Sequence, residues 1–197
     1  MADTKTAAAG GAWNLPNILT YGRVAAVPVV VALLFWPDED WARWTALGVY
    51  AVAAITDFFD GYLARAWSQQ SSLGRMLDPI ADKLLVAAAL LMLSADGTIT
   101  GASLWAAIVI LCREILVSGL REYLAELRVR VPVTAVAKWK TTAQLVALGF
   151  LIAGPAGEKA IAGAHVAGIV LLWIAATLTL YTGWDYMKAS YQHVGGV

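Results

Sequence analysis

The sequence has almost no cysteine and little charge. One cysteine, Cys112, occurs among 197 residues, which excludes an intrachain disulfide and leaves no metal-binding cysteine motif. We expect Cys112 to be a small apolar residue in the protein core. Only 14% of the residues are Asp, Glu, Lys or Arg, and the net charge is zero, so the positions of the charges are more informative than their sum.

Apolar residues dominate the sequence instead. They make up 60% of it, the mean hydropathy is +0.67, and several apolar runs approach twenty residues. This composition predicts an all-α integral membrane protein. We expect a disordered N-terminus over residues 1–11, a membrane domain over 12–187 that begins with a short interfacial segment, and a cytoplasmic tail over 188–197. The six predicted transmembrane helices cover about residues 18–36, 41–67, 73–94, 102–127, 133–153 and 161–186.

The basic residues support this count of six. If both termini are cytoplasmic, all Lys and Arg residues except Arg43 and Lys159 fall on the cytoplasmic half, a bias of twelve to two. Cytoplasmic loops of membrane proteins carry such an excess. We therefore expect a multi-pass membrane protein whose two termini lie on the cytoplasmic side.

Four carboxylates lie at the cytoplasmic ends of the second and third predicted helices. Residues three and four apart share a helix face. Asp57 therefore lies on one stripe with Gly61 and Arg65, and Asp60 lies beside it. On the next helix Gly74, Asp78 and Asp82 form the matching stripe. Small residues beside the acids leave room for a bulky anionic group to approach.

Four neighbouring carboxylates in a membrane domain need a positive partner. One Asp deep in a transmembrane helix costs roughly 2.5 to 3.5 kcal/mol. Two carboxylates about 5 Å apart repel by ~3 kcal/mol more at an effective dielectric of 20. Oxygen ligands suit hard cations, so two Mg²⁺ or Mn²⁺ ions would balance the four charges. With Arg65 and Arg75 alongside, this site is suited to a diphosphate.

The pattern Asp-x2-Asp-Gly-x2-Ala-Arg-x8-Gly-x3-Asp-x3-Asp is complete from Asp57 to Asp82 and resembles the signature of the CDP-alcohol phosphotransferases. That family implies six transmembrane helices, usually a homodimer, and transfer of a substituted phosphate from a CDP-linked donor to an alcohol with release of CMP. The resemblance implies that Asp57 and Asp78 bridge both cations and that Asp60 holds one. It implies that Asp82 holds the other cation and acts as general base.

The resemblance extends over three further segments, which are similar to those of family members that use glycerol 3-phosphate as acceptor: Asn14 to Arg23, Cys112 to Glu122 and Ala137 to Gln144. It implies phosphatidyl transfer from CDP-diacylglycerol to sn-glycerol 3-phosphate, giving phosphatidylglycerophosphate and CMP. The residues expected to contact the CDP-lipid are Asn17, Thr20, Gly61, Arg65 and Ser71. The cations expected to hold the acceptor's phosphate are Arg113, Arg121, Lys138 and Lys140, with Arg113 and Lys138 as the leading candidates. Membrane lipids are further partners, and no nucleic acid is expected.

Two alternatives remain open. A related enzyme could use another acceptor, such as inositol phosphate, serine or phosphatidylglycerol. A divalent-cation transporter also places acidic residues in its membrane helices. A transporter needs these acids near the middle of the bilayer, whereas here they lie toward one interface beside Arg65 and Arg75, which favours the enzyme.

Overall fold

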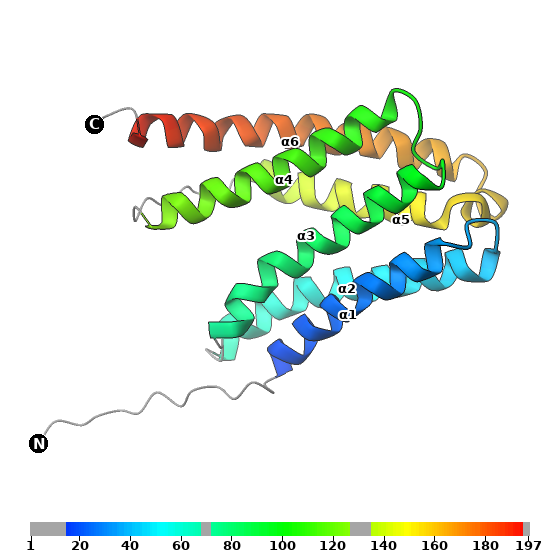
Figure 1. Cartoon of the computed structure of the whole chain (residues 1–197), viewed down its shortest axis with the longest axis horizontal. Coiled ribbons are helices and arrows are strands. Elements are labelled where there is room, and N and C mark those ends of the chain that lie inside the picture. The colour runs from blue at the N-terminus through cyan, green and yellow to red at the C-terminus, as the bar shows by residue number, and fades with distance from the viewer. Residues whose placement is uncertain (1–14, 68–71, 127–134, 195–197) are drawn as a thin grey trace, which may run out of the picture.

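The computed structural model of the chain is a bundle of six α-helices (Figure 1). The helices are α1 (Leu15–Leu34), α2 (Asp40–Trp67), α3 (Ser72–Ala95), α4 (Ser103–Glu126), α5 (Ala135–Ala160) and α6 (Ala164–Val194). The six helices predicted from the apolar runs are therefore confirmed as helices.

The structure describes residues 15–67, 72–126 and 135–194. Within these ranges it leaves out the side chains of residues 15, 16, 57–67, 72–75, 78, 126, 135, 185, 189, 190 and 192–194. The expected disordered N-terminus, Ser71 and the loop around Pro132 lie outside the described residues.

Two helix boundaries differ from the prediction. Gly154 interrupts α5 with a positive φ of 49°, just after the predicted end at residue 153, but further helical residues follow up to Ala160. At the other end of the chain, α6 continues eight residues past Tyr186 to Val194. No glycine or proline occurs between Tyr186 and Gly195, so the sequence offers nothing to stop the helix earlier.

The helices pack as a ring in the order α1, α2, α5, α6, α4, α3, and α3 also touches α5 across it. The turns between α1 and α2, α3 and α4, and α5 and α6 all lie at one end of the bundle, on the right of Figure 1; we call it the turn end. At the opposite end, α2 finishes while α3 and α5 begin; because it carries the Asp57–Asp82 motif, we call it the motif end. Residues from all six helices form the core, among them Leu34, Tyr50, Leu93, Ile110, Leu151 and Leu172.

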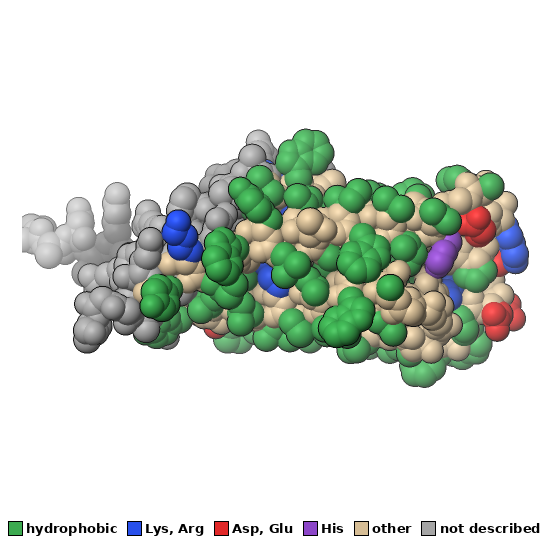
Figure 2. All heavy atoms as spheres, turned by 90° about the horizontal axis from the view of Figure 1, so that it is seen from above, with side chains coloured by type: hydrophobic (Ala, Val, Ile, Leu, Met, Phe, Trp, Pro, Cys, Tyr) green, Lys and Arg blue, Asp and Glu red, His purple; other side chains and the backbone are tan. Residues whose placement is uncertain are grey.

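Large apolar side chains also cover much of the outside of the bundle. Trp105, Ile115 and Leu180 are more than half exposed, and Figure 2 shows apolar side chains spread along one face of the molecule. Among the described residues, three segments are long and apolar enough to cross a membrane: Asn17–Leu34, Ser103–Ala125 and Ala164–Lys188. Such a surface is that of a membrane protein.

The expectation for Cys112 was wrong, since its side chain is exposed on α4. A small apolar residue gains nothing from burial when the surroundings are lipid, because lipid tails are as apolar as the core.

A buried arginine closes the turn end. Arg43 donates from Nη2 to Asp96 Oδ2 at 2.7 Å and from Nε to the Pro37 carbonyl at 3.0 Å. A Cβ on Gly154 would lie 3.1 Å from the Arg43 guanidinium carbon, so the glycine allows this close approach. Lys159 pairs with Asp40 at the same end. The two basic residues that the charge pattern separated from the other twelve are therefore found together, away from the motif.

Candidate active site

The motif carboxylates stand on two uninterrupted helices. The backbone of α2 is helical through Asp57 and Asp60, and that of α3 is helical through Asp78 and Asp82. The helical spacing that placed these residues on shared faces is therefore confirmed for the backbone. The side chains of Asp57, Asp60, Asp78 and Arg65 and the surroundings of Gly61 are outside the described part. The roles predicted for the three carboxylates as cation ligands, and for Gly61 and Arg65 as contacts of the CDP-lipid, stay predictions.

Asp82 is the one motif carboxylate whose side chain is described. It is partly buried, and it acts electrostatically on Tyr50 of α2 and on Lys140 of α5. Tyr50 in turn donates its hydroxyl to the Leu145 carbonyl of α5 at 3.4 Å. Asp82 therefore lies on the side of α3 that is directed toward α2 and α5, the two helices that α3 contacts there.

Lys140 belongs to a buried ion network. It is only 5% exposed, and its ammonium pairs with the Glu114 carboxylate of α4. Lys138 is exposed, because two residues turn an α-helix by roughly 200° and place it on the opposite face. The sequence placed both lysines among the cations expected to hold the acceptor's phosphate, with Lys138 as a leading candidate. The structure instead places Lys140 inside the bundle and Lys138 on its surface.

Arg113 joins α4 to α6. Its Nη2 donates to the Thr182 hydroxyl at 2.8 Å, and its Nη1 lies 3.8 Å from Glu114 Oε1. Gly183 makes room for this side chain, since a Cβ there would lie 3.2 Å from Arg113 Cγ. Arg113, Glu114 and Lys140 therefore form one connected group, which we call the α4–α5 ion network.

Arg121 lies farther along α4, toward the motif end. It is exposed, donates to the Tyr186 hydroxyl at 3.2 Å, and has its guanidinium carbon 5.5 Å from the centre of the Tyr186 ring. Of the four predicted acceptor cations, the structure brings Arg113 and Lys140 together and leaves Arg121 and Lys138 on the surface.

Three buried polar atoms near this network have no hydrogen-bond partner among the described residues: Arg113 Nε, Gln144 Oε1 and Thr179 Oγ1. Gln144 follows Lys140 by one helical turn, and Thr179 precedes Thr182 by about one turn. More than about 90% of buried polar groups in proteins are paired. Unpaired atoms on α4, α5 and α6 are expected where a polar ligand completes the pairing.

The inward face of α1 carries three polar residues of the segment from Asn14 to Arg23. Asn17, Thr20 and Arg23 are spaced three apart, are all nearly fully buried, and are engaged with other residues. Because α1 packs on α2 and α3, this polar face points toward the two helices that carry the carboxylates.

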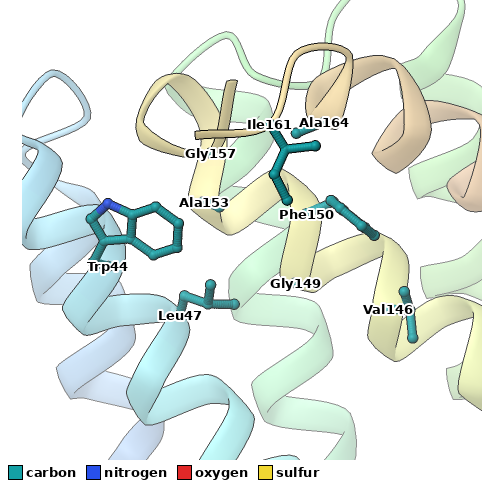
Figure 3. A pocket seen from close by; sticks show the side chains of 9 residues that line it. All are labelled: Trp44, Leu47, Val146, Gly149, Phe150, Ala153, Gly157, Ile161 and Ala164. Atoms are coloured by element: carbon teal, nitrogen blue, oxygen red, sulfur yellow. The ribbon is translucent and has the colours of Figure 1, made fainter. Parts of the chain in front are cut away.

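A crevice of about 240 Å³ between α3 and α4 reaches the network from one side. Its polar lining residues are Lys83 on α3 and Glu114, Ser118 and Glu122 on α4. A second cavity, of about 290 Å³, lies between α2, α5 and the start of α6 (Figure 3). Its walls are apolar, from Trp44 on α2 to Ile161 in the α5–α6 turn, so this second cavity has no side chain for phosphate chemistry.

Sequence reasoning missed four residues of the site: Glu114, Gln144, Thr182 and Tyr186. Glu114 and Gln144 occur in two of the segments that carry the resemblance, but no expectation was attached to either residue. The one available signal was that Thr182 and Tyr186 are four apart on an otherwise apolar helix and so share a face.

Comparison with known proteins agrees with the motif. Residues 13–181 match the family described as CDP-alcohol phosphatidyltransferase. The chain is 47% identical to a protein of Rickettsia bellii, over 89% of this chain and 94% of the relative. It is 40% identical to one of Cereibacter sphaeroides (89% and 95%) and 42% identical to one of Escherichia coli K12 (90% and 95%). All three are named CDP-diacylglycerol--glycerol-3-phosphate 3-phosphatidyltransferase.

Proposed function

Since the chain belongs to the CDP-alcohol phosphatidyltransferase family, we propose that it transfers the phosphatidyl group of CDP-diacylglycerol to sn-glycerol 3-phosphate, giving phosphatidylglycerophosphate and CMP. One observation carries the proposal. The complete Asp57–Asp82 pattern occurs in a chain 40 to 47% identical, over about nine tenths of its length, to proteins named for this reaction.

We propose that Asp57, Asp60, Asp78 and Asp82 hold two divalent cations, Mg²⁺ or Mn²⁺. The donor set fits, because it consists of carboxylates on two continuous helices with small residues beside them. When bound, the cations supply positive charge that neutralises the diphosphate and the transferred phosphoryl group. In this assignment Asp57 and Asp78 would serve both cations, and Asp60 and Asp82 would serve one each.

The donor occupies the motif end in this proposal. Gly61, Arg65 and Ser71 would contact the donor, with the Arg65 guanidinium paired with the diphosphate. Asn17 and Thr20 reach it from the buried face of α1, which packs on α2 and α3. The acyl chains of the lipid stay in the bilayer.

Asp82 performs the proton transfer. The hydroxyl oxygen of glycerol 3-phosphate attacks the phosphorus of the phosphatidyl group, and its proton passes to the Asp82 carboxylate. The bond from that phosphorus to the CMP oxygen breaks, so CMP leaves with the bonding electrons. Asp82 suits this role because it faces the interior and interacts with Lys140, beside the group proposed to hold the acceptor.

The acceptor's phosphate needs cations of its own, because it adds about two negative charges at neutral pH. We assign it to Arg113 and Lys140, the two buried cations of the α4–α5 ion network. The unpaired Arg113 Nε supports this assignment, since a phosphate oxygen can accept from it. Arg121 follows Glu114 by two helical turns on α4 and is exposed, so it would assist the acceptor's phosphate as it enters. Lys138 is exposed on the opposite face of α5 from Lys140.

Substitution of the two lysines separates these assignments. Lys140→Met is expected to raise the KM for glycerol 3-phosphate about tenfold or more, because a charge-assisted hydrogen bond contributes roughly 1.5 to 3 kcal/mol. Lys138→Met is expected to change this KM much less. Initial rates against glycerol 3-phosphate at saturating donor and cation measure both. The reverse order of effects would return the role to Lys138.

We also propose that all six helices span the inner membrane, that both termini and the active site face the cytoplasm, and that the protein is a homodimer. The bias of twelve basic residues to two and the gathering of Arg43 and Lys159 at the turn end support this orientation.

Labelling of introduced cysteines in intact cells tests this orientation. A cysteine at position 71 should resist an impermeant thiol reagent, because it would lie on the cytoplasmic side, and one at position 38 should react. The opposite labelling would reverse the orientation.

The activity itself is tested with purified protein, CDP-diacylglycerol, Mg²⁺ or Mn²⁺, and a panel of acceptors. CMP release that depends on glycerol 3-phosphate is expected. Release with serine, inositol phosphate or phosphatidylglycerol instead would identify a different member of the family.

A further inference from the structure

We propose that Glu114 is a positioning residue of the acceptor pocket, which holds Lys140 and Arg113 in the arrangement that binds the acceptor's phosphate. This inference rests on the proposed function, because it concerns the same phosphate site. Glu114 carries the same sign of charge as the acceptor's phosphate, so the two groups repel each other. A carboxylate in this site therefore needs a role that outweighs the repulsion.

Glu114 stands between the two buried cations. One of its oxygens, Oε1, contacts the Lys140 ammonium and lies 3.8 Å from Arg113 Nη1. The side chains involved are largely buried, with 17% of Glu114, 7% of Lys140 and 10% of Arg113 exposed. A single oxygen atom therefore lies within ion-pair distance of both the ammonium and the guanidinium.

The two cations are held in place by different contacts. Lysine ends in a point charge on a flexible four-carbon stem, and no described residue other than Glu114 pairs with the Lys140 ammonium in an ion pair. Arg113 is already held at its far edge by Thr182. The ammonium has three hydrogens, and the contact with Glu114 uses one, which leaves two for a phosphate.

Glu114 is also reachable. It lines the α3–α4 crevice together with Ser118 and Glu122, which follow it at intervals of one turn on α4. Glu122 is exposed and makes no contact with the network, so it offers a control on the same helix face.

The sign of one kinetic effect distinguishes positioning from competition. If Glu114 only competed with the phosphate for Lys140, its neutralisation would free the ammonium and lower the KM for glycerol 3-phosphate. If it positions the two cations, neutralisation leaves Lys140 without an anchor, and this KM rises.

The test uses the full-length enzyme with CDP-diacylglycerol and glycerol 3-phosphate. Glu114→Gln is expected to raise the KM for glycerol 3-phosphate about tenfold, with little change in kcat or in the KM for CDP-diacylglycerol. Glu122→Gln is expected to leave all three unchanged. Because Glu114 acts partly through Lys140, the double variant Glu114→Gln/Lys140→Met should raise this KM by less than the product of the two single effects.

Three results would overturn the inference: an unchanged or lower KM in Glu114→Gln, equal losses for both substrates, or additive effects in the double variant. If Glu114→Gln does not fold, Glu114→Asp takes its place, and its shorter side chain should raise the same KM by a smaller factor. A wild-type enzyme that ignores glycerol 3-phosphate would refute the proposed function instead, before any variant is compared.

Discussion

Asp78→Asn is expected to abolish turnover, and Asp57→Asn to do the same. In the proposed site each of these carboxylates contacts both cations, so each substitution removes one of the four negative charges that balance two dications. The loss cannot be made up by neighbours, because a neutral amide oxygen is a weaker ligand for a hard cation than a carboxylate. CMP release from CDP-diacylglycerol, followed over a wide range of Mg²⁺ and Mn²⁺ concentrations, measures the effect.

The matched control for this prediction is Asp38→Asn, which removes an exposed carboxylate in the turn between α1 and α2, at the turn end. It should have wild-type turnover. Excess cation should restore little activity to Asp78→Asn, since the bridging position itself is changed. Turnover near the wild-type rate in Asp57→Asn or Asp78→Asn would contradict the assignment of these residues as shared ligands.

Asp82→Asn is expected to have the second largest effect, a loss of about 10² to 10⁴ in kcat, which is the usual contribution of a general base. The amide cannot accept the hydroxyl proton of glycerol 3-phosphate. Binding of CDP-diacylglycerol should persist, because three carboxylates and the contacts from α1 and α2 remain. Single-turnover rates and equilibrium binding of the donor separate these two consequences.

The prediction for Asp82 has a clear point of failure. If Asp82→Asn keeps a near-normal rate, another group removes the proton. If donor binding falls in parallel with the rate, Asp82 acts chiefly as a cation ligand. Asp82 is partly buried and acts electrostatically on Lys140, so an acceptor held by Lys140 would bring its hydroxyl toward the same side of α3, which favours the base.

The sequence predicted the helices well because their signals are local. Apolar runs set the lengths of the six helices, and Pro37, Gly97 and Gly154 mark turns or breaks that the structure contains. The spacing of the four acids needed only a helical backbone to place them on shared faces, and the backbone is helical there. The end of α6 was misplaced because no residue before Gly195 breaks the helix.

The sequence by itself determined the helical membrane architecture, the family and the four carboxylates of the motif, since each depends on composition or on spacing along one helix. The tertiary structure alone decided that Lys140 rather than Lys138 faces inward, that Glu114 joins Lys140 to Arg113, and that Thr182 of α6 completes the group. The physical reason is that lipid and protein interior are similarly apolar, so hydrophobic periodicity hardly distinguishes the two faces of a membrane helix. Which polar residue points inward then depends on the neighbouring helices, and those neighbours come from segments distant in the chain.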